Sequence, residues 1–156
     1  MKTLNQIIVD YTAHLQQGQL QIAYKGILDY LGSLNSDFPS KYPDYEIGSH
    51  IYQGYMDMSY FSLYTNQLKQ KGLKIAIVYL HEKAAFEVWL SARSREIMKR
   101  YKTIFTAKAL KGISVFHDAD NEDAVIECTL TSEPDFDKQF LLTEIIERVQ
   151  RSLYLL

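Results

Sequence analysis

The sequence has little of what cross-links a fold or carries it through a membrane. It contains one cysteine, which excludes an internal disulfide and a zinc site built from several cysteines. With no second thiol in the chain, Cys128 is expected to be a small buried apolar residue. No apolar run approaches the roughly 18 residues of a membrane span, and residues 1–15 lack the apolar core and cleavage site of a signal peptide. We therefore expect a cytoplasmic protein without membrane contact.

Motifs for nucleotide, metal and nucleophilic chemistry are missing as well. The seven glycines form neither a G-x-x-x-x-G-K nor a G-x-G-x-x-G loop, and there is no G-x-S-x-G elbow. The four histidines are isolated, with no H-E-x-x-H. The acidic run from Asp118 begins like a calcium loop, but it has Asp123 where glycine is needed and Thr129 where a bidentate Glu is needed. We interpret the run as an acidic hairpin loop, and expect no cofactor and no bound metal.

What is present is the composition of one globular domain. Hydrophobic residues make up 47% of the 156 residues and charged residues 23%, which is ordinary for a single domain of about 100 to 200 residues. We expect residues 1–156 to form one domain. Its parts are a helical hairpin at 1–37, a long loop at 38–54, and a sheet with two packed helices at 55–156.

The N-terminal part predicts two helices joined by a short link. Apolar residues repeat at helical spacing over residues 3–16 and again over residues 20–34. Gly18 is expected to end the first helix, because glycine takes the left-handed conformation at little cost. So short a link favours an antiparallel helical hairpin. Pro39 is expected to end the second helix, because proline disfavours helix at the residue before it.

After residue 54 the chain changes to strands. Segments with strand residue types and alternation are 55–64, 73–80, 84–91, 112–118 and 124–130. One helix is expected at 94–108, and a last one begins with Ser132 as N-cap. Short turns between the strands favour antiparallel pairing. The predicted fold class is α+β, an N-terminal helical hairpin followed by β-β-β-α-β-β-α with a mainly antiparallel five-stranded sheet.

The hairpin at residues 73–91 holds the least expected residue of the sequence. With a two-residue turn, one face carries Ile75, Ile77, Tyr79, His81, Phe86, Val88 and Leu90, and the other carries Ala76, Val78, Leu80, Glu87 and Trp89. A three-residue turn would regroup them. In either register Glu87 and Trp89 share a side, because they are two residues apart in a strand. Both faces are apolar enough to be covered by helices, so Glu87 either reaches water at an edge or forms part of a polar pocket.

A ligand site is predicted where this hairpin meets a tyrosine-rich segment. Six of the twelve tyrosines fall within residues 42–64, and tyrosine suits interfaces and ligand pockets as well as strand packing. The candidate ligand-binding residues are Tyr60, Asp57, Glu87, Trp89 and Tyr55. A metal-dependent hydrolase using Asp57 and Glu87 is an alternative. The usual E-x-K arrangement of such enzymes would put lysine at position 89, where this chain has the only tryptophan.

The charge distribution supplies a second alternative. The net charge is −2, yet seven basic residues lie between Arg93 and Lys111 against one acid, and eight acidic residues lie from Asp118 to Asp137 without a base. Arg95, Lys99 and Lys102 fall on the outer face of the expected helix and could follow the phosphates of a nucleic acid. Any amphipathic surface helix has the same appearance.

Residues 54–101 resemble a family of short bacterial proteins known only as a domain of unknown function. The resemblance lies in the Y-M-D-M-S-Y-F start, the L-K-I-A-I-V centre and the F-E-V-W-L strand, and it implies no activity. A looser likeness, in element order alone, is to a domain attached to some restriction-system proteins. The residues favour a binding or interaction module over an enzyme. The expected partner is a small molecule or a protein at the tyrosine-rich segment, or alternatively a nucleic acid in a defence system. A homodimer is a further possibility.

Overall fold

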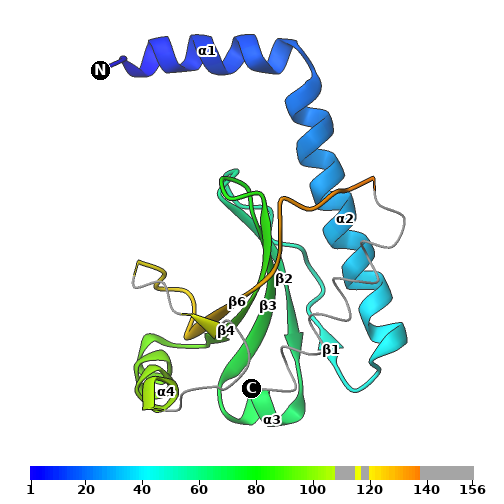
Figure 1. Cartoon of the computed structure of the whole chain (residues 1–156), viewed down its shortest axis with the longest axis vertical. Helices are drawn as coiled ribbons and strands as arrows, with labels where there is room; N and C mark the ends of the chain where they lie inside the picture. Colours follow the sequence, from blue (N-terminus) through cyan, green and yellow to red (C-terminus); the bar gives the residue numbers. More distant parts are fainter. Residues whose placement is uncertain (108–114, 117–119, 138–156) are drawn as a thin grey trace.

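The computed structural model describes residues 1–107, 115–116 and 120–137 (Figure 1). Its helices are α1 (Leu4–Gln16), α2 (Gln19–Lys41), α3 (Asn66–Gln70) and α4 (Arg95–Ala107). Its strands are β1 (Glu46–Ile47), β2 (Met58–Tyr64), β3 (Leu73–Leu80), β4 (Ala85–Ala92), β5 (Val115–Phe116) and β6 (Ile126–Ser132). In this part of the chain the strands form one sheet in the order β1-β2-β3-β4-β6-β5, and every pair in it is antiparallel.

The predicted α+β order is confirmed, with N-terminal helices, five antiparallel strands and an intervening helix. Strand β1 adds a short sixth strand at the edge. The predicted N-cap at Ser132 is wrong, because that residue ends β6. The rest of the last predicted helix lies outside the described residues. None of the helices in the described ranges is both long and apolar enough to cross a membrane.

Helix α2 covers one face of the sheet, which we call the first face (Figure 1). Leu31, Leu34 and Phe38 are buried and supply the helix side of the core. They pack with the hairpin residues that a two-residue turn groups together, namely Ile75, Ile77, Tyr79, Phe86, Val88 and Leu90. Cys128, expected to be buried, is only half-buried at the margin of this core.

Helix α2 continues past the predicted stop at Pro39 and ends at Lys41. A proline in a helix interior costs about 3 kcal/mol or more. Here the neighbouring Phe38 is buried against the rings of Tyr42 and Tyr45, with centroid separations of 5.2 and 5.5 Å. Tertiary packing thus holds a helical turn that the local sequence disfavours. The loop predicted at residues 38–54 is correspondingly shorter, and β1 lies within it.

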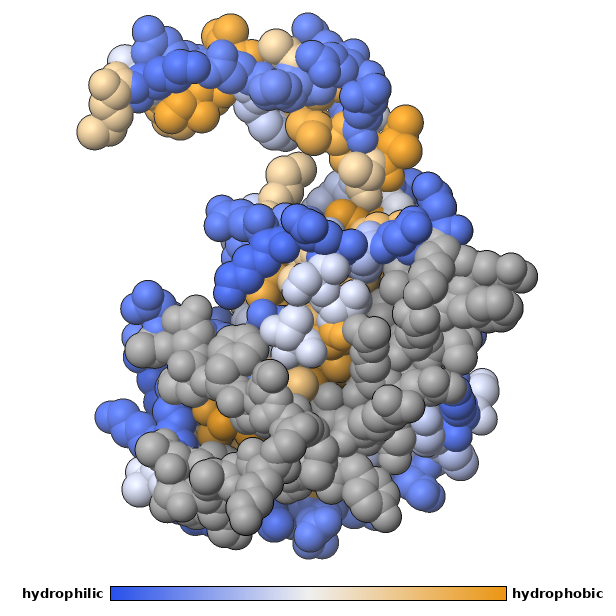
Figure 2. All heavy atoms as spheres, viewed as in Figure 1, coloured by the Kyte–Doolittle hydropathy of each residue, from blue (hydrophilic) through white to orange (hydrophobic). Residues whose placement is uncertain are grey.

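Helix α1 points away from α2, so the predicted antiparallel hairpin does not form (Figure 1). Gly18 does end α1 as expected, with φ at 77°. No residue of α1 is buried. Its apolar side chains, among them Leu4, Ile7 and Tyr11, are exposed, and apolar side chains are visible on this projecting part of the molecule in Figure 2. Helical spacing predicted the helix correctly, but it carries no information about which surface the apolar stripe meets.

The opposite face of the sheet, the second face, has a much smaller apolar cluster. Ala76, Val78, Trp89 and Ala124 are its buried members, with Met58, Tyr60 and Leu80 packed beside them. The sequence predicted that helices cover both faces, and most of the last of these helices lies outside the described residues. In the described part of the chain, two cavities lie on the second face.

Candidate functional site

The β3–β4 hairpin has the register of a two-residue turn. Val78 pairs with Glu87, and Ala76 pairs with Trp89. The alternative of a three-residue turn is therefore wrong. Because side chains alternate along a strand, Glu87 and Trp89 both project from the second face.

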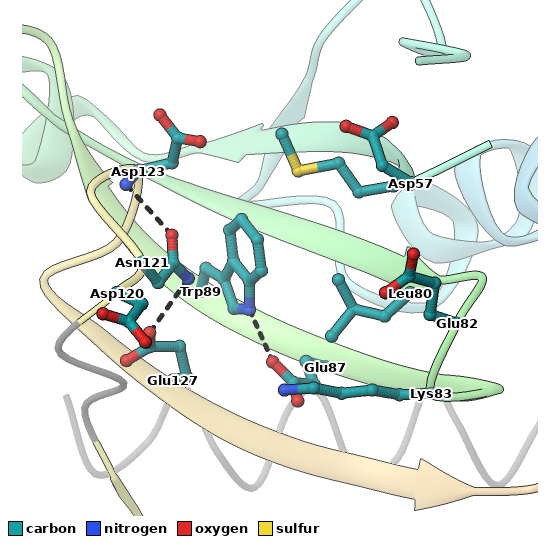
Figure 3. Close-up of a pocket in the computed structure, with 11 residues that line it drawn as sticks. Asp57, Leu80, Glu82, Lys83, Glu87, Trp89, Asp120, Asn121, Asp123 and Glu127 are labelled. Atoms are coloured by element: carbon teal, nitrogen blue, oxygen red, sulfur yellow. Dashed lines mark hydrogen bonds between the residues drawn. The ribbon is translucent and has the colours of Figure 1, made fainter. Parts of the chain in front are cut away.

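A cavity of about 340 Å³ opens on the second face around these two residues (Figure 3). We call it the acidic cavity. Its lining residues are Asp57, Met58, Leu80, Glu82, Lys83, Glu87, Trp89, Asp120, Asn121, Asp123 and Glu127. Six of these eleven residues are Asp or Glu and one is Lys. A concave site lined by one sign of charge concentrates ions of the opposite sign, so the cavity attracts cations.

Glu87 is the central polar residue of the acidic cavity. Its side chain is buried, with the residue only 4% exposed. Trp89 Nε1 donates a hydrogen bond of 2.7 Å to Glu87 Oε2 (Figure 3). Among the described residues no other donor reaches this carboxyl group, so Oε1 faces the cavity without a partner. A buried carboxylate with one donor is costly, because water is lost and only partly replaced.

Glu127 brings a second buried carboxyl group to the same cavity. It is 1% exposed and lies directly opposite Trp89 in the β4–β6 ladder. Asn121 Nδ2 donates to Glu127 Oε1 at 2.9 Å, and Asn121 Oδ1 accepts from the Asp123 backbone N–H at 3.0 Å. The loop before β6 is held to β4, since Ser91 Oγ donates to the Asp123 carbonyl at 2.7 Å. The position of Glu127 is thus fixed from two sides.

Asp57 lies at the edge of the cavity, on a tight turn before β2. Gly54 makes the turn, with φ at 72°, and a Cβ there would lie 2.1 Å from the Met58 carbonyl oxygen. Only glycine fits this position. Asp57 Oδ1 accepts from the Tyr55 backbone N–H at 2.9 Å. Hydrogen bonds from backbone groups, that of Met58 first, lower the pKa of the exposed Asp57 carboxyl.

The described carboxyl groups do not form a metal site. No group of three or more His, Cys, Asp or Glu in the described ranges is arranged to hold a metal ion. Asp57 and Glu87, the pair proposed for a metal-dependent hydrolase, both line the cavity. Their hydrogen bonds go to a backbone turn and to an indole N–H.

A second cavity of about 440 Å³ adjoins the first on the same face. Met58, Trp89 and Asp123 line both cavities. The second cavity contains the cationic residues Lys74, Arg93 and Arg95 together with Tyr52, Tyr60 and Glu122. We call the two adjoining cavities together the groove; Trp89 lines both its acidic and its basic end.

The structure brings together most of the predicted ligand-binding residues. Asp57, Glu87 and Trp89 line the acidic cavity, and Tyr60 lines the adjoining one. Tyr55 lines neither of them and is 92% exposed.

The three predicted anion-binding residues do not form one surface with the groove. Arg95 lines the adjoining cavity and pairs with Glu122 at 3.3 Å, where both side chains are exposed. Lys99 is exposed and Lys102 is half-buried on α4. Neither lines the two cavities.

Sequence reasoning missed Glu127, Asn121 and Lys74. Glu127 had a usable signal, since it stands in the apolar strand segment A-V-I-E-C-T-L just as Glu87 stands in A-A-F-E-V-W-L. What the sequence could not supply is the pairing of β6 with β4. That pairing changes register between Phe86 and Glu87.

His81, on the first face, connects the hairpin turn to α2 through its contact with Tyr24, and its environment predicts a pH dependence. Ser59 Oγ donates to the Gln53 carbonyl at 2.6 Å, so its contact of 2.9 Å with His81 Nε2 has the imidazole as donor. The ring of His81 lies 5.4 Å from that of Tyr24. Burial lowers the pKa of His81 more than the charge of Asp57 raises it.

The expected result is a loss of stability on acidification. Because the folded-state pKa lies below the ordinary 6.5, the unfolded chain takes up the proton first, and stability falls as the pH drops through 6.5. Urea unfolding at about pH 7.5 and about pH 5.5 measures this. His81→Gln should reduce the difference, whereas His14→Gln, on the exposed face of α1, should retain it. An unchanged pH dependence in His81→Gln would contradict the assignment.

Comparison with known proteins identifies a family. A family model described as a domain of unknown function, DUF7000, matches residues 4–154. No curated protein and no solved structure matches the chain.

Proposed function

The chain belongs to the DUF7000 family, a domain of unknown function, and we propose that it is a non-catalytic binding module that holds an organic cation in the acidic cavity. One observation carries the proposal. Glu87 is buried, lines the cavity and presents an oxygen without a donor in the described part of the chain.

An ammonium or guanidinium group would supply the missing donors. It would hydrogen-bond to Glu87 and be attracted by Glu127 across the β4–β6 ladder. Trp89 adds a second attraction, because a cation over an indole ring is stabilised by about 0.5–2 kcal/mol. Its N–H already bonds to Glu87, so the ring is held in place before a ligand arrives. Such preorganisation lowers the entropy cost of binding.

The lining of the acidic cavity favours binding over catalysis. Among the described residues it contains carboxyl groups, an amide and an amine, and no Ser, Cys or His that could serve as nucleophile with an adjacent base. The hydrolase hypothesis lacks a described metal cluster. The nucleic-acid hypothesis stays a prediction that the described contacts do not favour, because Arg95 is directed to Glu122.

The test uses the only tryptophan of the chain as its probe. We expect n-butylammonium to change the fluorescence of Trp89 in a saturable way and n-butanol, of similar shape but neutral, to have no such effect. Glu87→Gln should weaken the binding of the amine by about tenfold or more, equivalent to about 1.4 kcal/mol. Glu96→Gln, an exposed glutamate outside both cavities, is the matched control. Equal responses to amine and alcohol would overturn the proposal.

A further inference from the structure

The groove on the second face has opposite charges at its two ends. Along β4, Glu87, Trp89 and Ser91 follow one another at alternate positions, and Lys74 lies opposite Ser91 on β3. Glu87 lines the acidic cavity, and Ser91 and Lys74 line the adjoining one. Glu87 and Ser91 are four residues apart along β4, which corresponds to about 13 Å.

Two cations at the basic end have no carboxylate partner among the described residues. Lys74 Nζ lies 5.5 Å from the centre of the Tyr60 ring, and its only described contact is with that ring. Arg93 uses its backbone N–H to bond the Gly72 carbonyl at 2.8 Å, and its exposed side chain has no ion pair in the described part of the chain. Both residues line the adjoining cavity. They are therefore available for an anion.

Between the two ends the lining is mainly apolar, with one carboxyl group. Met58, Trp89 and Asp123 line both cavities, and Ala76 and Tyr60 line the basic part. A ligand that spans the groove thus needs a cation, an apolar or neutral middle, and an anion, in that order.

We propose that the ligand is a short peptide with free ends, which places its α-ammonium group in the acidic cavity and its α-carboxylate at Lys74 and Arg93. An extended chain covers about 3.3–3.6 Å per residue, so three or four residues match a span of about 13 Å. The opposed charges orient the peptide, since reversing it would put like charges together at both ends. This inference rests on the proposed function, because the ammonium end uses the same Glu87.

The experiment compares alanine peptides by Trp89 fluorescence and calorimetry. Tri- and tetra-alanine with free ends should bind more tightly than n-butylammonium, and dialanine should bind less tightly than either peptide. N-acetylation and C-amidation should each weaken binding by about tenfold. The double variant K74Q/R93Q should lose the distinction between free and amidated peptide. The control K71Q/K99Q, which changes two exposed lysines outside both cavities, should keep it.

The outcomes separate this inference from the function on which it rests. If n-butylammonium binds but C-amidation and K74Q/R93Q change nothing, the peptide assignment fails and the cation site stands. If N-acetylation changes nothing while C-amidation weakens binding, the ammonium end is wrong and the proposed function falls with it. Affinity that rises steadily up to hexa-alanine would overturn the predicted span.

Discussion

Replacing Phe86 by alanine is expected to lower the free energy of unfolding by about 3–5 kcal/mol. Phe86 is 0% exposed. Its ring centroid lies 4.9 Å from that of Tyr79, 6.0 Å from that of Phe136 and 6.4 Å from that of Tyr30. These rings come from β3, from the chain after β6 and from α2. Truncation leaves a cavity at the point where three parts of the first-face core meet, and the surrounding structure relaxes only partly.

The expected loss of stability is large relative to the total free energy of unfolding. Domains of this kind have unfolding free energies of about 5–15 kcal/mol, so the variant would be close to unfolded at the lower end. Urea unfolding followed by circular dichroism measures the change. Tyr55→Ala is the matched control, since it truncates an aromatic ring that is exposed, and it should change stability by about 0.5 kcal/mol or less. A loss under about 1 kcal/mol in Phe86→Ala would mean that this aromatic cluster does not hold α2 on the sheet.

The hairpin shows how far the sequence alone could go. Alternation of side chains is a local property, so the division of β3 and β4 into two faces followed from the residue order and one turn length. Glu87 and Trp89 were therefore predicted on one side, and their hydrogen bond is a short-range consequence. The same local pattern correctly gave the five predicted strands of the sheet but not the short strand β1.

Features that depend on distant contacts could not be predicted in this way. Pro39 stands inside α2 because Phe38 packs in the core, and helix propensity cannot report that packing. Glu127 reaches the cavity because β6 pairs with β4 across a change of register. Both are cases in which tertiary contacts override or complete a local signal.

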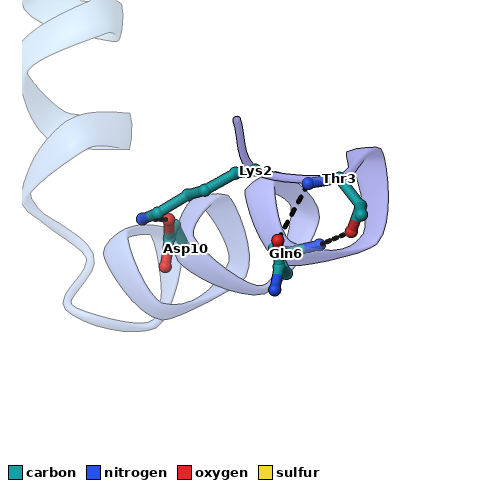
Figure 4. Close-up of polar contacts among 4 residues, drawn as sticks. All are labelled: Lys2, Thr3, Gln6 and Asp10. Carbon is teal, nitrogen blue, oxygen red and sulfur yellow. Dashed lines mark hydrogen bonds and ion pairs between the residues drawn. The ribbon is translucent and has the colours of Figure 1, made fainter.

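Helix α1 shows most clearly that local sequence can predict a helix without predicting its tertiary contacts. Its first turn is closed by a capping box, in which Thr3 Oγ1 accepts from the Gln6 N–H at 3.3 Å and Gln6 Oε1 accepts from the Thr3 N–H at 2.8 Å (Figure 4). Lys2 pairs with Asp10 on the same helix. These local contacts, with helical spacing, account for the helix. They do not determine how α1 is oriented relative to α2 at Gly18.

Burial has opposite expected effects on stability at the two faces of the sheet. On the first face, most buried side chains are apolar, and burial of these side chains adds to stability. On the second face, Glu87 and Glu127 are buried on neighbouring strands, and Glu87 has one donor in the described part of the chain, Trp89 Nε1. Because strained or unsatisfied polar groups concentrate at functional sites, the buried Glu87 carboxyl group supports the proposed ligand site.

Glu87→Gln is therefore expected to stabilise the ligand-free protein by about 1–2 kcal/mol while it weakens binding of the amine. The amide oxygen of glutamine can still accept from Trp89 Nε1, so the bond of 2.7 Å survives. The substitution removes the charge beside Glu127 and the cost of burying it, and its NH2 group can reach water in the cavity. Urea unfolding of the free protein measures the gain, and Glu96→Gln, exposed on α4, should change stability by about 0.5 kcal/mol or less. A structural role for the Glu87 charge makes the opposite prediction, because removing a charge that supports the fold lowers stability, and a destabilised Glu87→Gln would count against the binding site.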